Sequence, residues 1–164
     1  MRGNELEQSA AKGILIEKRL KGVVNVNYTQ DGSSYIVRID RGEDVMAKLA
    51  EFARETDIGS ATITGIGAVS EVELGIYSAE ISAYKHYTYK GDLEIISLTG
   101  NITKKDGAYH VHLHSVVSDG KSVTVGGHVE RCIIVGTSEL RVQTLEKTYS
   151  RKLDEETGLH ILDI

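Results

Sequence analysis

The chain has 164 residues, of which 40% are hydrophobic and 26% charged, and its formal net charge is −5. This length and composition are typical of one globular domain that buries a core without disulfides or a structural metal. No apolar run approaches the roughly 18 residues that cross a bilayer, and the first residues lack the apolar core of a signal peptide. We therefore expect a cytoplasmic protein with no membrane segment. The acidic balance disfavours direct DNA binding, because nucleic-acid-binding domains usually carry a basic surface.

The elements expected in chain order are mostly strands. Residues 1–33 are the least regular part and are interpreted as an N-terminal extension of a domain that spans residues 34–164. A strand is predicted at residues 35–39, and apolar residues at helical spacing then predict one main amphipathic helix at about residues 43–55. After Gly59 nearly every segment has the composition of a strand. The sequence thus predicts an α+β fold with a large, mostly antiparallel β-sheet, one main helix and minor helices.

Histidines alternate along one of the predicted strands. His110, His112 and His114 fall within residues 109–114, and His128 follows two glycines. Residues at i and i+2 of a strand project from the same face, so a third histidine on the neighbouring strand would complete a three-histidine metal site. His110 shares this face and is expected to be a bystander. Cys132, the single cysteine, has apolar neighbours and is expected in the core instead of at a catalytic site.

The turn between the two strands decides whether the histidines meet. With a two-residue loop at Asp119 and Gly120, His128 would lie opposite Val111 and face away from His112. One extra residue, either in a loop of residues 119–121 or in a bulge at residues 126–127, would place His128 opposite His112. The metal site therefore requires one of these two additions.

The predicted cofactor is a divalent metal ion. Neutral imidazoles suit zinc, iron, nickel and copper, and zinc is the first expectation, with iron and nickel as alternatives. An enzyme would also need acid, base or charge-stabilising groups near the ion. Glu94, Arg131 and Glu139 are candidates for such groups by residue type only, and Glu94 with Arg131 is alternatively an interface or surface pair.

Three stretches of the chain together resemble one known family. Residues 91–102, the run at 111–114 and residues 126–128 are similar to the plants-and-prokaryotes-conserved (PPC) domain, also called the domain of unknown function 296 family. The resemblance extends from about residue 35 to 145 and includes the tail at 154–159. It implies an α+β fold, a homotrimer and, in prokaryotic members, a metal bound by the histidines that match His112, His114 and His128. The fold is also similar, more distantly, to the zinc enzyme acetolactate decarboxylase.

The resemblance bears on partners as well. Plant relatives carry an AT-hook, whose Arg-Gly-Arg-Pro element binds DNA, whereas this chain has no proline and therefore no such hook. The segment that plant members use to contact partners matches residues 91–96, so partner or trimer contacts are expected at Gly91, Leu93, Glu94, Ile95 and Ile96.

The function expected from these observations is a trimeric metal-binding domain that serves as a binding or regulatory module. The alternatives are a metal-dependent lyase or hydrolase with an acetolactate-decarboxylase-like site, and a DNA-binding protein without an AT-hook.

Overall fold

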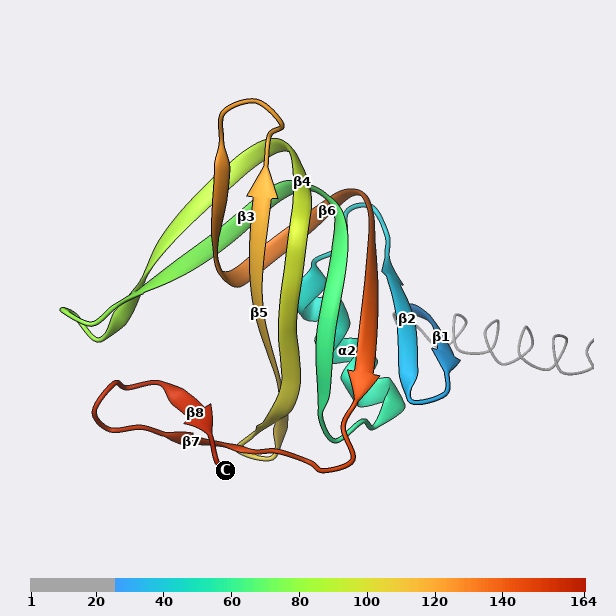
Figure 1. Ribbon diagram of the computed structural model, residues 1–164, viewed down its shortest axis with the longest axis vertical. Helices are drawn as coiled ribbons and strands as arrows, with labels where there is room; N and C mark the ends of the chain where they lie inside the picture. The colour runs from blue at the N-terminus through green and yellow to red at the C-terminus, as the bar shows by residue number, and fades with distance from the viewer. Residues whose placement is uncertain (1–25) are drawn as a thin grey trace, which may run out of the picture.

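The computed structural model describes residues 26–164, which form a curved antiparallel sheet, one helix and a small C-terminal hairpin (Figure 1). The elements are β1 Asn27–Asp31, β2 Ser34–Ile39, α2 Val45–Thr56, β3 Ala61–Ser78, β4 Ala83–Lys105, β5 Ala108–Ser118, β6 Thr124–Thr144, β7 Arg151–Leu153 and β8 His160–Leu162. Every strand pairing in these two sheets is antiparallel. The predicted α+β fold with a large antiparallel sheet is therefore confirmed.

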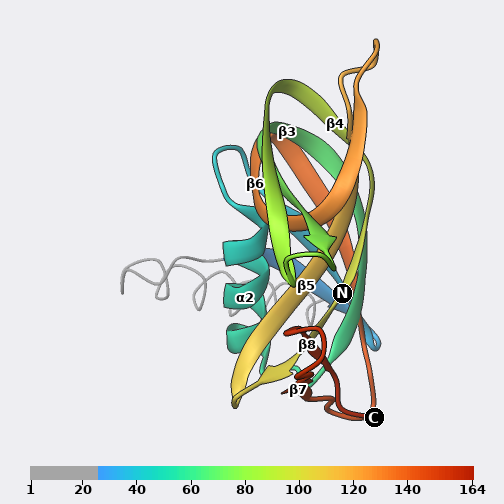
Figure 2. The same cartoon turned by 90° about the vertical axis from the view of Figure 1, so that its left-hand side faces the viewer.

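The main sheet closes on itself at one end. Its strand order is β1-β2-β6-β3-β4-β5, and β6 also pairs with β5. The 21 residues of β6 make this double role feasible, because its first part pairs with β5 and its last part with β2. Figure 2 shows the resulting curvature, with α2 lying along one side of the sheet. The side of the sheet away from α2 is called the outer face below.

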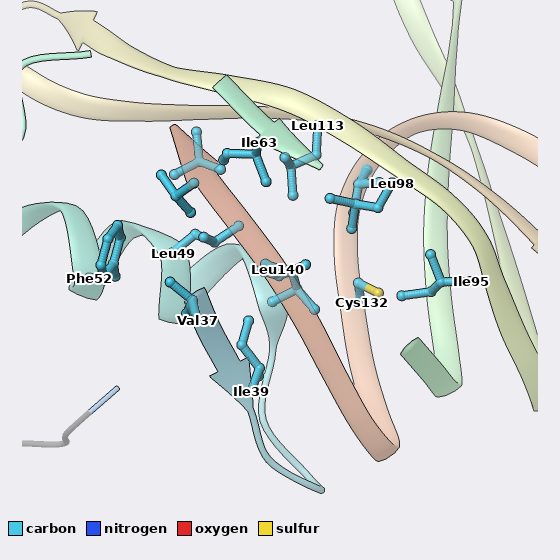
Figure 3. Packing of buried hydrophobic residues seen from close by; sticks show 14 of the residues in the cluster. Val37, Ile39, Leu49, Phe52, Ile63, Ile95, Leu98, Leu113, Cys132 and Leu140 are labelled. Carbon is cyan, nitrogen blue, oxygen red and sulfur yellow. The ribbon is translucent and has the colours of Figure 1, made fainter. Parts of the chain in front are cut away.

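The hydrophobic core lies between α2 and the sheet (Figure 3). Val45, Leu49 and Phe52 recur at helical spacing and are completely buried, each contributing about 1.5–3 kcal/mol by burial. Asp44 caps the helix, since its side chain accepts a hydrogen bond from the Met46 amide at 3.2 Å. The helix thus begins at Val45, slightly later than predicted, and it is the one helix in residues 26–164, where the predicted minor helices are not found.

The N-terminal boundary of the fold lies earlier than the sequence indicated. β1 falls within the predicted extension of residues 1–33 but pairs with β2 along its whole length. The Tyr28 ring of β1 packs edge-on against Phe52 of α2, with ring centroids 5.1 Å apart. Residues 26–33 therefore belong to the domain, and the rest of the predicted extension lies outside the described residues.

The described residues hold no helix with the length and apolar character needed to cross a membrane. Cys132 is completely buried, as expected, and burial raises the pKa of its thiol to about 12. The thiol is therefore protonated and unreactive at neutral pH.

Candidate metal centre

The structure brings His112, His114 and His128 together on the outer face of the sheet. One ring nitrogen from each lies within 4.8 Å of the others. Alternation along β5 produces this arrangement, since Val111 and Leu113 point into the core while the histidines between and beside them point outward. Small rotations of the rings would bring the nitrogens to the separation of about 3.4 Å that tetrahedral zinc requires.

The register between β5 and β6 differs from both sequence alternatives. His128 lies opposite His114, not opposite Val111 or His112. The last pair before the turn is Ser118 with Thr124, so the loop spans five residues, 119–123. A five-residue loop shifts the pairing by two positions relative to the predicted three-residue loop, and a shift of two keeps every side chain on the same face. The predicted cluster therefore forms, although the predicted partner of His128 was wrong.

The side chain of Asp119 stabilises this longer loop. Its Oδ1 accepts hydrogen bonds from the backbone amides of Lys121, Ser122 and Val123, at 2.9, 3.0 and 3.0 Å. These bonds lower the pKa of the Asp119 carboxyl, with the Lys121 amide contributing most, and outweigh the opposite effect of desolvation. The charged carboxylate thus replaces the backbone partners that a tight hairpin would supply.

The two glycines before His128 allow a close approach between strands. The pairing of β5 with β6 is continuous through Gly126 and Gly127, so the alternative of a bulge there is not found. A Cβ atom on Gly127 would lie 2.8 Å from the carbonyl oxygen of Gly75 in β3. Glycine at 127 therefore keeps β3 and β6 in contact beside His128.

His128 has one ring nitrogen without a protein partner. Its Nδ1 is buried and has no hydrogen bond within residues 26–164. Its Nε2 lies 3.5 Å from Oε1 of Glu130, and the Tyr84 ring covers the imidazole with centroids 4.9 Å apart. An unsatisfied buried polar atom costs about 1–3 kcal/mol, and a metal ion at Nδ1 would remove that cost. A carboxylate behind a ligating histidine is the usual support of such a site.

His112 is contacted by an arginine from the C-terminal hairpin. Nη2 of Arg151 lies 3.2 Å from His112 Nδ1 and 2.9 Å from Oδ1 of Asn101. The guanidinium also donates to Oγ1 of Thr103 at 3.0 Å and to the His160 carbonyl at 2.8 Å. Because a guanidinium only donates, Nδ1 of His112 accepts this bond, and the four contacts together hold Arg151 beside the histidines.

Burial favours the neutral state of His110, His112 and His128, and the neutral state is the one that a metal ligand requires. Burial lowers the pKa of His112 to about 4, and repulsion from His128 and Arg151 adds to the effect. Burial likewise lowers the pKa of His128. The bystander His110 has its pKa lowered to about 4, first by burial and then by Arg151 and Lys105. Neutral imidazoles offer their lone pairs to a cation, so the donor set fits a divalent ion.

A pocket of about 650 Å³ adjoins the cluster. Its walls include His112 and His128, Arg151 and part of the C-terminal hairpin. Sequence reasoning missed Arg151, which has no regular spacing to the histidines. It also missed Glu130, which the i+2 relationship to His128 on the same strand could have indicated.

The polar groups proposed from residue type lie elsewhere. Arg131 pairs with Glu71 at 2.7 Å, Glu94 borders a separate hollow beside Asp119, and Glu139 lies opposite Arg38. None of the three candidates is among the residues that line the histidine pocket.

The predicted contact segment at residues 91–96 is divided between the core and the surface. Leu93 and Ile95 are buried in the core, whereas Gly91, Glu94 and Ile96 are exposed. Of the five residues predicted to contact a partner, these three are therefore the accessible ones.

The fold and the cluster define a class of small β-rich proteins that carry a candidate metal centre on the outer face of a closed antiparallel sheet. A model of the Plants and Prokaryotes Conserved (PCC) domain matches residues 26–146, and the chain belongs to this family. The family expected from the sequence is therefore confirmed.

Several solved structures are similar to the chain. A presumed DNA-binding protein from Bacteroides thetaiotaomicron is 32% identical, with a TM-score of 0.81, over 84% of this chain and 96% of that one. A metal-containing protein from Archaeoglobus fulgidus is 28% identical, with a TM-score of 0.74, over 84% and 97% of the two chains. Acetolactate decarboxylase from Bacillus subtilis is 13% identical, with a TM-score of 0.54, over 82% and 61%, which shows a shared fold alone.

One curated protein is also similar. The chain is 30% identical over 133 residues to the bifunctional protein GlmU of Synechococcus sp.. The match covers 77% of this chain but 20% of that protein, so the chain spans about a fifth of the length of the curated relative.

Proposed function

We propose that the protein is a metal-binding module in which His112, His114 and His128 hold one divalent ion. The observation that carries the proposal is the convergence of one ring nitrogen from each histidine within 4.8 Å, in a cluster where the Nδ1 of His128 is buried and has no protein partner among the described residues. Zinc is the first ion to test, followed by iron and nickel, because neutral imidazoles suit all three. The description of the Archaeoglobus relative as metal-containing supports the proposal.

Elemental analysis of protein purified without chelators tests this assignment. We expect about one ion per chain in the wild type and less than a tenth of that in His114→Ala, since two imidazoles bind far more weakly than three. The His110→Ala variant is the matched control, because His110 lies on the same strand and face but outside the cluster. Metal-free wild-type protein, or equal metal in wild type and His114→Ala, would contradict the proposal.

A homotrimer is part of the proposal, with the outer face of the sheet as the contact surface. Ile36, Ile66 and Ile96 are 48%, 57% and 58% exposed and line one hollow on this face. Large apolar side chains gathered on one surface are typical of a protein contact. Light scattering coupled to gel filtration should give three chains per particle, and Ile66→Asp should yield monomers with an unchanged circular dichroism spectrum.

A metal-dependent lyase or hydrolase is the second candidate function. The pocket beside the histidines favours it, since a ligand entering the pocket would reach the ion's open coordination position. If the protein converts a substrate in a reaction that depends on added metal and is lost in His114→Ala, the protein is an enzyme and not a binding module.

A further inference from the structure

We propose that the pocket beside the histidines binds a small organic anion, a carboxylate with a short apolar chain, through Lys105 and Arg151. This inference deepens the proposed function by naming the ligand class of the same site. The charges that would attract the anion belong to protein side chains alone, so the pocket should also bind it in the metal-free protein.

The charged residues that line the pocket are all basic. Lys105 and Arg151 both line it, and no aspartate or glutamate does. The whole chain has 24 acidic and 19 basic residues, so a lining with cations alone departs from the general surface. The carboxylate of Glu130, beside His128 Nε2, is not among the lining residues. The pocket therefore selects for negative charge.

Arg151 is held in place without a counter-ion. Its partners are the neutral oxygens of Asn101, Thr103 and His160 and a ring nitrogen of His112. Within residues 26–164 no carboxylate lies at ion-pair distance from Arg151 or Lys105. A half-buried cation without a counter-ion is costly, and an anionic ligand would compensate it.

The number of free N–H groups on Arg151 limits how many direct hydrogen bonds it can donate to a ligand. A guanidinium has five N–H groups, and the four observed contacts leave one Nη1 hydrogen for a ligand. Lys105 has no hydrogen-bond partner for its ammonium group among the described residues and supplies the second contact. One fixed donor and one flexible donor suit the two oxygens of a single carboxylate.

The apolar side of the pocket defines the rest of the ligand. Leu159, Ile161 and Leu162 of the C-terminal segment line it, together with Tyr84. A hydrogen bond of 2.8 Å from the Tyr77 hydroxyl of β3 to the Thr157 carbonyl holds the C-terminal hairpin against the sheet. A pocket of about 650 Å³ lies in the usual size range for small molecules. A short hydrocarbon chain would therefore pack against the hairpin while its carboxylate meets the two cations.

Calorimetric titration of the chelator-treated, metal-free full chain tests the inference. The probe is isovalerate, and its neutral isostere isovaleramide and inorganic phosphate are the comparisons. We expect isovalerate to bind at least about tenfold more tightly than either, which corresponds to one charge-assisted hydrogen bond. The Lys105→Met variant should lose about tenfold in affinity, whereas Lys85→Met, which removes an exposed lysine of β4 outside the pocket, should bind as the wild type does.

Other outcomes overturn the inference. Equal affinities for isovalerate and isovaleramide would show that the negative charge plays no part. Equal affinities for isovalerate and phosphate would show that the pocket does not select carboxylates. Unchanged affinity in Lys105→Met rules out the proposed contact of Lys105. This test does not use an Arg151 variant, because replacing Arg151 would also remove its hydrogen bond to the hairpin at His160. Because the titrated protein holds no metal, a failure of metal binding leaves this result intact, and absent anion binding leaves the metal assignment intact.

Discussion

His114 of β5 and His128 of β6 lie directly opposite each other, with ring centroids 5.6 Å apart. This pairing follows from the register set by the Ser118–Thr124 pair at the end of the loop, since a shift of one position would turn His128 to the opposite face. The site therefore depends on a register set by a pair that contains none of its histidines.

Deleting one residue between the turn and His128 should abolish metal binding. Deleting Val125 leaves the five-residue loop in place but brings His128 opposite Ser115, on the opposite face of the sheet. Deleting Lys121 instead shortens the loop to four residues and leaves His128 opposite His114. Elemental analysis should find about one ion per chain in the Lys121 deletion and almost none in the Val125 deletion, and the reverse order would contradict the observed register.

Replacing Glu130 should weaken the metal site without unfolding the protein. The Glu130 carboxylate lies 3.5 Å from Nε2 of His128 and would orient the ring with Nδ1 toward the ion. Loss of such a supporting group typically costs about 10–100-fold in metal affinity. Competition with a coloured zinc chelator should show this loss in Glu130→Gln and no change in Glu73→Gln, which removes the carboxylate beside His86 instead.

The contribution of Asp119 to stability should depend on pH. Hydrogen bonds from the loop amides lower the pKa of this carboxyl below its ordinary value of 3.8. Its stabilisation is therefore complete above that ordinary value and is lost as the pH falls through the lower pKa of the folded state. Urea unfolding should show Asp119→Asn to be less stable than the wild type at pH 7, with the difference shrinking below about pH 4. A pH-independent difference would mean that the charge plays no part.

Gly100 should resist substitution because it lies against the histidine strand. A Cβ atom there would overlap the carbonyl oxygen of His112, so β4 and β5 would have to separate. We expect Gly100→Ala to lower the free energy of unfolding by about 1–3 kcal/mol. Gly136→Ala is the control, since its Cβ would meet Ala68 at 3.6 Å, an ordinary contact. Equal stability of the two variants in urea unfolding would disprove the close approach.

Much of the fold could be predicted because alternation and helical spacing are local signals. The helix containing Leu49 and Phe52, the strands and the shared face of His112 and His114 follow from such spacing. The polar strand β1 was not located within residues 1–33, because all its residues are exposed and show no apolar alternation. The Asp31-Gly32 turn, with Gly32 at a φ of 58°, was the signal that could have found it.

The details of the site were less accessible from the sequence. The register of β5 against β6 could not be predicted, because it depends on the five-residue loop that the Asp119 side chain stabilises. This side chain accepts hydrogen bonds from three loop amides, and no periodic pattern in the sequence indicates such bonds. Arg151 reaches His112 only through the path of the C-terminal segment across the sheet, which is a property of the whole fold. Glu130 alone had a local signal, its position two residues after His128.

The arginine that meets the histidines comes from β7, beyond the residues matched by the family model, which end at 146. The histidine ligand set lies inside the matched region, while Arg151 and the apolar wall around Leu159 lie outside it. The proposed metal ligands thus lie within the matched stretch, whereas the proposed anion pocket combines Lys105 from that stretch with Arg151 and the apolar wall from the tail. Exchanging the tail between family members should therefore change what the pocket accepts and leave the three histidines in place.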